Sequence, residues 1–307
     1  VYDYTPLYTF LLDKISNKEN IYKSQINYHL FLSLISTIAI FVYLRLSVDI
    51  KYIFLIVIIL GTHYCVNNWG IKSSLAWTIS SFIGSLAVIL QFTRRKLSLL
   101  LTLISVLFHQ IGLTLLVMGF MVNLIYHFNL LFSVDNFKNF LKREIPFIPI
   151  YLIIIFLGLK FKYTPFDLSD INVATVYTID YFNLFNIFNS WKLNLVVFKG
   201  FFIKTIILLN PILLFFFLSS FFLKISDNFK IIKIYTVIFV FTIILFIHGI
   251  GEFAIGKRLW PIFVINYLIL SISSIYFFSK KNIFFKYLKN IFLLSTPFFI
   301  LINISLH

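Results

Sequence analysis

Charged residues are scarce in this chain of 307 residues: 12% are Asp, Glu, Lys or Arg, while 60% are hydrophobic. The mean hydropathy is +0.97. In ordinary soluble domains about a quarter of the residues are charged. The scarcity of charge therefore excludes a soluble globular fold, and the sequence predicts a polytopic membrane protein.

Cysteine is nearly absent as well. The single cysteine, Cys65, lies inside an apolar run, and one thiol can form neither a disulfide framework nor a thiolate metal cluster. The chain also contains no Walker loop, zinc motif, Gly-x-Ser-x-Gly elbow or dinucleotide fingerprint. We expect no metal and no cofactor.

A signal peptide is missing too, because no basic segment after Val1 leads into an apolar core. We expect that an upstream segment of the protein precedes Val1. Residues 1–26 mix polar and aromatic side chains, which predicts an interfacial segment on the extracytoplasmic side of the membrane.

The formal net charge of +15 comes from Lys and Arg residues that lie mostly in short connections between apolar runs. This placement indicates membrane topology and anchoring. We therefore expect membrane lipid, and no nucleic acid, as a partner.

A long apolar stretch, Leu97–Phe132, is interrupted by one polar group, Phe108-His109-Gln110-Ile111-Gly112. A bilayer core about 30 Å thick needs roughly 20 helical residues, so this stretch predicts two short membrane segments. Basic residues flank it on both sides, at 94–96 and 138–143, and the positive-inside rule places both flanks in the cytoplasm. The stretch is thus expected to be a hairpin whose turn, with His109, lies at the extracytoplasmic face.

The same alternation along the chain predicts an all-α transmembrane helix bundle in one integral membrane domain, 1–307, with extracytoplasmic loops. About nine membrane segments are expected: Tyr28–Leu46, Tyr52–Val66, Ser73–Phe92, the His109 hairpin, Ile145–Leu159, Leu193–Leu223, Ile234–Ile247, Leu259–Phe278 and Ile291–Leu306.

Three local features refine this bundle. Ser73–Phe92 is rich in Ser, Gly and Ala, which predicts a central helix with close neighbours. The dipeptide Asn210-Pro211 predicts a kink. Lys160–Lys192 is expected to be the main extracytoplasmic loop, and its Asp167, Asp170 and Trp191 are candidates for sugar contacts.

The predicted topology gathers ionisable side chains on the extracytoplasmic side, where they are candidates for function. His109 is either a general base or a turn histidine that bonds a backbone carbonyl. Lys257 and Arg258 either grip a diphosphate or only anchor the helix end. Lys72 allows the same two interpretations, and Glu252 adds an acid that anchoring does not require.

Four segments together resemble the EpsG-like branch of Wzy-type polysaccharide polymerases: Trp69-Gly70-Ile71-Lys72-Ser73-Ser74-Leu75-Ala76, Phe108-His109-Gln110, Tyr4-Thr5-Pro6-Leu7-Tyr8 and Gly256-Lys257-Arg258. The resemblance covers most of the chain, but its motifs are short. The family usually has Arg where Lys72 stands, and a small hydroxyl residue where Gln110-Ile111-Gly112 follows the histidine.

The resemblance implies a metal-independent glycosyltransferase in the inner membrane of a bacterium. Such an enzyme polymerises undecaprenyl-diphosphate-linked repeat units into O-antigen, capsule or exopolysaccharide at the outer face, with a chain-length regulator and a flippase as candidate partners. It implies that His109 or Glu252 acts as the base and that Lys72, Lys257 and Arg258 bind the diphosphate. Gln110, Asp167, Asp170 and Trp191 would contact the glycan. The alternative is a transporter or flippase of lipid-linked glycans, which would need broken, polar helices near the middle of the membrane.

Overall fold

The computed structural model describes residues 7, 10–11, 14, 21–63, 75–109, 111–127, 134–160, 184–246 and 255–306. These residues form helices and short connections, with no strand among them, so the all-α class is confirmed for this part of the chain. Contacts between the helices divide the chain into two compact units. The expected single membrane domain stays a prediction, and each unit is described by itself.

The first unit contains Val1–Tyr43 and Leu75–Phe166. Its helices are α2 up to Tyr43 (α2 is Ile21–Ser47), α5 (Leu75–Leu90), α6 (Arg95–Phe108), α7 (Ile111–Tyr126), α9 (Val134–Glu144) and α10 (Ile148–Lys160), with a 3-10 turn, Ile145–Phe147, between the last two.

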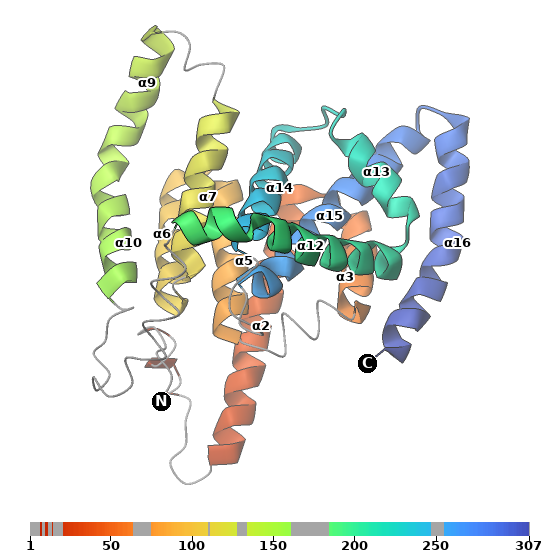
Figure 1. Cartoon of the computed structure of the whole chain (residues 1–307), viewed down its shortest axis with the longest axis horizontal. Coiled ribbons are helices and arrows are strands. Elements are labelled where there is room, and N and C mark those ends of the chain that lie inside the picture. Colours follow the sequence, from red (N-terminus) through yellow and green to blue (C-terminus); the bar gives the residue numbers. More distant parts are fainter. Residues whose placement is uncertain are drawn as a thin grey trace. The chain divides into compact units, whose positions relative to one another are not determined.

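Helix α5 is the core of this unit, because α6 and α7 both pack against it (Figure 1). Residues 79–90 of α5 are all buried, and they include three serines, a glycine and an alanine. Small side chains let neighbouring helix backbones come close. The central position predicted for this segment is therefore confirmed within the first unit.

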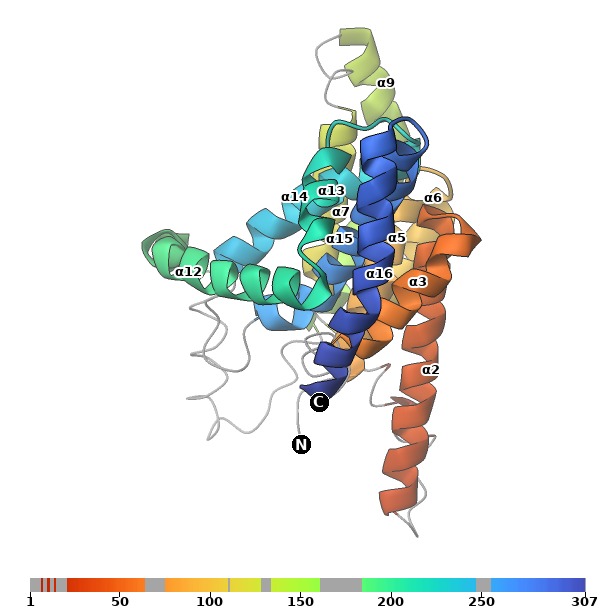
Figure 2. The same ribbon diagram turned by 90° about the vertical axis from the view of Figure 1, so that its right-hand side faces the viewer.

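The second unit contains Leu44–Ser74 and Asp167–His307. After the last turn of α2, its helices are α3 (Ile50–Thr62), α12 (Leu184–Leu209), α13 (Ile212–Ser220), α14 (Asp227–Phe246), α15 (Ile255–Ser279) and α16 (Ile283–Ser305). Helix α15 contacts α3, α13, α14 and α16, and almost every described side chain between Trp260 and Ile275 is buried. Helix α15 is thus the core of the second unit (Figure 2).

The predicted kink at Asn210-Pro211 is confirmed as a break. Helices α12 and α13 meet there at 114°, and α12 runs across the direction of α16 in both views (Figures 1 and 2). Asn210 has φ 109°, its Oδ1 accepts a hydrogen bond from the Ile212 N–H at 3.1 Å, and its Nδ2 donates one to Ser295 Oγ at 2.7 Å. A positive φ is tolerated better by Asn than by most residues, so Asn210 both makes the corner and fixes it.

Three helices of the described chain are long and apolar enough to cross a membrane, or four if the bent pair α12–α13 is one span. The three are Leu30–Ser47 in α2, Trp260–Ser279 in α15 and Ile283–Ser305 in α16. This finding supports a membrane protein but corrects the expected nine segments. Helices α3, α5 and α7 have 13, 16 and 16 residues, which at 1.5 Å per residue makes them about 20–24 Å long, shorter than a bilayer core of about 30 Å.

Three element boundaries differ from expectation. Helix α2 begins at Ile21, so the last residues of the predicted interfacial segment 1–26 belong to it. Residues 184–192 of the predicted loop Lys160–Lys192 are helical in α12, because Leu184, Phe188 and Leu195 recur at helical spacing. The basic stretch 138–143 lies in helix α9, where the sequence predicts a connection between membrane segments.

Candidate functional site

His109 lies in the break between α6 and α7, since α6 ends at Phe108 and α7 begins at Ile111. The hairpin turn predicted at His109–Gly112 is therefore confirmed. His109 has an extended backbone (φ −164°, ψ 145°), and its N–H donates to the Ser105 carbonyl at 3.0 Å. The side chain is 7% exposed, so the turn histidine is a buried group.

Small polar residues of α5 and α6 hold the turn. Ser80 Oγ donates to the carbonyl of His109 at 3.2 Å and to that of Ser105 at 2.8 Å, and Ser105 Oγ donates back to the Ser80 carbonyl at 2.7 Å. A Cβ on Gly112 would come within 2.6 Å of the Val106 amide nitrogen, so only glycine fits there. These contacts fix the backbone on which the imidazole is mounted.

The imidazole is bonded to the start of α7. Nδ1 of His109 accepts the Ile111 N–H at 3.1 Å, and the His109 carbonyl accepts the Gly112 N–H at 3.0 Å. Helix starts leave such N–H groups without intrahelical partners, and an N-cap side chain satisfies one of them two or three residues on. The His109 side chain therefore satisfies a backbone N–H at the start of α7, as an N-cap side chain does.

This bond decides which nitrogen carries the proton. A neutral imidazole has one donor and one acceptor nitrogen, so with Nδ1 accepting from Ile111 the proton lies on Nε2. A histidine in this state offers a hydrogen bond through Nε2 and cannot take a proton there. The geometry therefore favours a turn histidine over the general base, although the partner of the imidazole is a backbone N–H and not the predicted carbonyl.

The other site residues predicted from the sequence are located only in part. Lys72, Gln110, Asp167, Asp170 and Glu252 lie outside the described residues.

Three more of these residues belong to described helices. Lys257 and Arg258 occupy the first turn of α15, and Trp191, expected in a loop, lies in α12. His109 belongs to the first unit and these three to the second, so their meeting in one site stays a prediction.

The sequence reading missed a buried ionic cluster at the other end of the hairpin, around Glu144, the last residue of α9. The Glu144 carboxylate accepts from Arg95 at the start of α6, from Arg143 Nε at 3.2 Å and from Asn123 Nδ2 of α7 at 3.3 Å. Arg95 also donates to the Tyr151 hydroxyl of α10 at 2.7 Å. The carboxylate therefore joins α6, α7 and α9, and Arg95 links α10 to them.

This cluster has a consequence for topology. Arg95 and Arg143 come from the two basic flanks of the Leu97–Phe132 stretch, and both bind Glu144. The two flanks thus lie together, at the opposite end of α6 from His109, as the hairpin prediction requires. The sequence feature that could have indicated this cluster is Glu144 itself, a single acid between Lys142-Arg143 and an apolar run.

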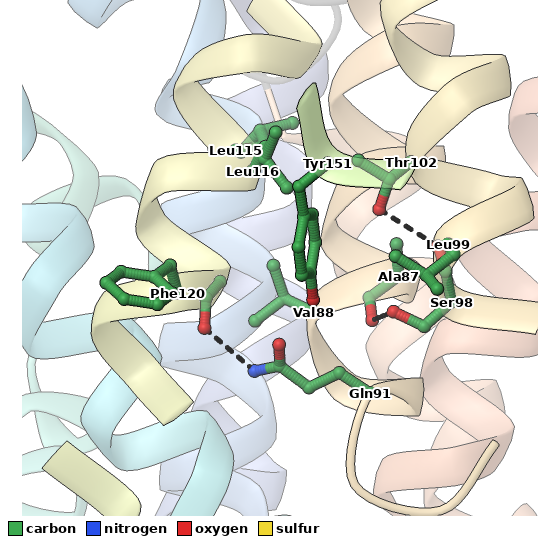
Figure 3. A pocket seen from close by; sticks show the side chains of 11 residues that line it. Ala87, Val88, Gln91, Ser98, Leu99, Thr102, Leu115, Leu116, Phe120 and Tyr151 are labelled. Atoms are coloured by element: carbon green, nitrogen blue, oxygen red, sulfur yellow. Dashed lines mark hydrogen bonds between the residues drawn. The ribbon is translucent and has the colours of Figure 1, made fainter. Parts of the chain in front are cut away.

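A narrow cavity lies between α5, α6, α7 and α10, with an empty volume of about 290 Å³. Figure 3 shows the Tyr151 ring among Leu115, Leu116 and Val88, and the Gln91 amide bonded to a carbonyl of α7. That carbonyl belongs to Gly119, at 3.0 Å. The lining combines apolar side chains with Gln91, Ser98, Thr102 and Tyr151, and the cavity is too narrow to hold an oligosaccharide.

Among the described residues no three His, Cys, Asp or Glu side chains gather where they could hold a metal ion. Comparison with known proteins gave no match to a family model, to a curated protein or to a solved structure.

Proposed function

We propose that this protein is a membrane glycosyltransferase that polymerises oligosaccharides carried on a lipid diphosphate, undecaprenyl diphosphate, at the extracytoplasmic face of a bacterial inner membrane. The observation that carries the proposal is the distribution of charge along α15. Lys257 and Arg258 lie in its first turn, and Lys280-Lys281 follow its last residue.

One of these two ends needs an explanation beyond anchoring. The positive-inside rule accounts for cations at one end of a membrane-crossing helix only. Lys280 and Arg45 line one cleft, and this gathering of cations supports the assignment of the Lys280 end to the cytoplasmic side. At the other end, Lys257 and Arg258 add charge to the positive end of the helix dipole, which is unfavourable unless an anion binds there. A diphosphate is an anion of that kind.

The reaction follows from these charges. The bond between the anomeric carbon and the lipid diphosphate breaks, a new bond forms to a hydroxyl of the acceptor glycan, and the lipid diphosphate leaves. Lys72, Lys257 and Arg258 stabilise the charge that develops on the leaving group. The acceptor proton goes to Glu252, because Nδ1 of His109 is already bonded to Ile111. His109 then holds the turn and is a positioning residue. Gln110, Asp167, Asp170 and Trp191 are the proposed glycan contacts.

The test is glycan laddering in cells that lack the gene and carry wild type or one variant at matched membrane level. Glu252→Gln and Arg258→Gln are each expected to lower the amount of long chains about 100-fold or more, while single-repeat material persists. His109→Ala is compared with His109→Asn, since an Asn side chain can still accept the Ile111 N–H. A positioning role predicts that Asn restores long chains and Ala does not, whereas loss of chains in both variants would return the base role to His109.

A transporter of lipid-linked glycans is the second candidate, and the break between α12 and α13 favours it. Discontinuous helices of this type form substrate sites in transporters, and the two helices meet at 114° around Asn210. If single repeats accumulate on the cytoplasmic side in the deleted cells, transport replaces polymerisation as the function.

A further inference from the structure

The second unit contains an open cleft at the end of α15 that is remote from Lys257 and Arg258. Its walls come from the link between α2 and α3, from the residues just before α14 and from the last turns of α15, and its empty volume, which includes open space, is about 1020 Å³. It is lined among others by Arg45, Asp49, Tyr52, Ser226, Tyr276 and Lys280.

Contacts between separate helices hold the walls of the cleft in place. The rings of Tyr52 and Tyr276 stack with centroids 3.8 Å apart and so join α3 to α15. Nδ2 of Asn228 donates to the Leu46 carbonyl at 2.9 Å and so joins the start of α14 to the end of α2. Phe229, which also lines the cleft, is 1% exposed. The walls are therefore held by contacts between separate elements.

Positive charge surrounds this cleft. Arg45 and Lys280 line it and are exposed. Asp49 supplies one negative charge to the lining, which two cations exceed.

Three more cations lie over rings of the lining. The Nζ atoms of Lys281, Lys289 and Lys233 lie 4.3, 4.8 and 5.5 Å from the ring centroids of Phe277, Tyr276 and Phe229. Burial, and then repulsion by Lys224 and Lys230, lower the pKa of Lys233. Cations thus gather around the cleft, and a bound anion would offset their mutual repulsion.

The depth of the cleft relative to the membrane limits which anion can bind there. Two candidate spans end here, Leu30–Ser47 and Trp260–Ser279, and Ser47 itself lines the cleft. The ends of spanning helices lie at the depth of lipid phosphates. Arginine offers a fork of N–H donors to phosphate, and lysine adds a point charge.

We propose that this cleft binds a phosphate group, with Arg45 and Lys280 as its ligands, and that an anionic phospholipid of the cytoplasmic leaflet supplies that group. The site does not depend on the proposed polymerisation, because it involves neither His109 nor the residues at the start of α15.

The experiment measures binding of dioctanoyl phosphatidylglycerol to the purified full chain in detergent by native mass spectrometry, with dioctanoyl phosphatidylcholine and inorganic phosphate as separate probes. Arg45→Gln/Lys280→Gln is compared with Lys286→Gln, which removes an exposed cation of α16 that is not part of the lining. Helix content and elution volume confirm that each variant is folded.

The proposal expects that phosphatidylglycerol binds to wild type and to Lys286→Gln, and that the double variant binds it about tenfold or more weakly, a loss of about 1.4 kcal/mol. Equal binding by all three proteins overturns it, and so does an equal loss in Lys286→Gln, which would show that bulk charge alone attracts the lipid. Binding of inorganic phosphate with the same dependence on Arg45 and Lys280 would overturn the lipid as the source.

Discussion

A single buried carboxylate, that of Glu144, shows how much one side chain decides in this chain. It is 7% exposed and accepts hydrogen bonds from Arg95, Arg143 and Asn123. A buried charge is tolerated only when it is paired and hydrogen-bonded, and here it has three partners on three helices. The sequence gives little indication of this role. Glu144 is one of 11 acidic residues, and it belongs to no recognised motif.

Replacing Glu144 with Gln is expected to destabilise the protein by about 3–5 kcal/mol, the usual cost of removing one partner from a buried ion pair. The change leaves Arg95 with an uncompensated charge. Unfolding by sodium dodecyl sulfate in mixed micelles, followed by circular dichroism, measures the difference.

Asp135→Asn is the matched control, because Asp135 lies in the same helix and is exposed. It is expected to change the unfolding free energy by less than about 0.5 kcal/mol. Similar effects of the two variants would show that the cluster around Glu144 contributes no more than a surface charge.

At the scale of elements, the sequence predicts where helices end better than how long they are. The break at Asn210-Pro211 and the turn at His109 were both predicted, because proline and short polar groups interrupt apolar runs for local steric reasons. The helical residues 184–192 were not, because Asn186, Asn189 and Lys192 made the segment look like a loop. The helical spacing of Leu184, Phe188 and Leu195 was the signal that could have found them.

Asn210 tests the corner between α12 and α13. Asn210→Ala removes the hydrogen bonds to Ile212 and Ser295 and forces alanine to φ 109°, so we expect a loss of about 2–4 kcal/mol. Asn210→Gly removes the same bonds but accepts the angle, so it is expected to cost about 1–3 kcal/mol less than Ala. The same micelle titration measures both.

Ser295→Ala separates the bond to α16 from the backbone angle, since it removes the acceptor of Asn210 Nδ2 and, within α16, the Ser295 bond to the Phe292 carbonyl. We expect it to cost about 1 kcal/mol. If Ala and Gly at position 210 are equally destabilising, the backbone angle makes no contribution and the corner is held by hydrogen bonds alone.

For the whole molecule, the main result concerns the charges at the two ends of α15, a helix whose residues 260–279 are long and apolar enough to cross a membrane. Cations occur at both of its ends, but only the Lys280 end is explained by topology. The polymerase proposal and the phosphate cleft use opposite ends of this helix and can therefore be tested independently.

Cysteine labelling tests the orientation that both proposals assume. In a Cys65→Ser background, Glu252→Cys is expected to react with a membrane-impermeant maleimide in intact spheroplasts, and Lys281→Cys only after permeabilisation, because residues 260–279 separate the two positions. Reaction of both positions without permeabilisation would mean that α15 does not cross the membrane.

The sequence by itself predicted the helical class that the described residues confirm. Its scarcity of charge and long apolar runs agree with the helices that are long and apolar enough to cross a membrane, because a backbone in lipid must satisfy its own hydrogen bonds. It also determined the His109 hairpin and the Asn210 corner, since both depend on residues adjacent in the chain. Only the tertiary structure decided that Glu144 joins Arg95 to Arg143, that His109 Nδ1 is bonded to Ile111, and that Arg45 and Lys280 line one cleft. Most of these groups are far apart in sequence, and the direction of a side chain depends on packing that no local pattern records.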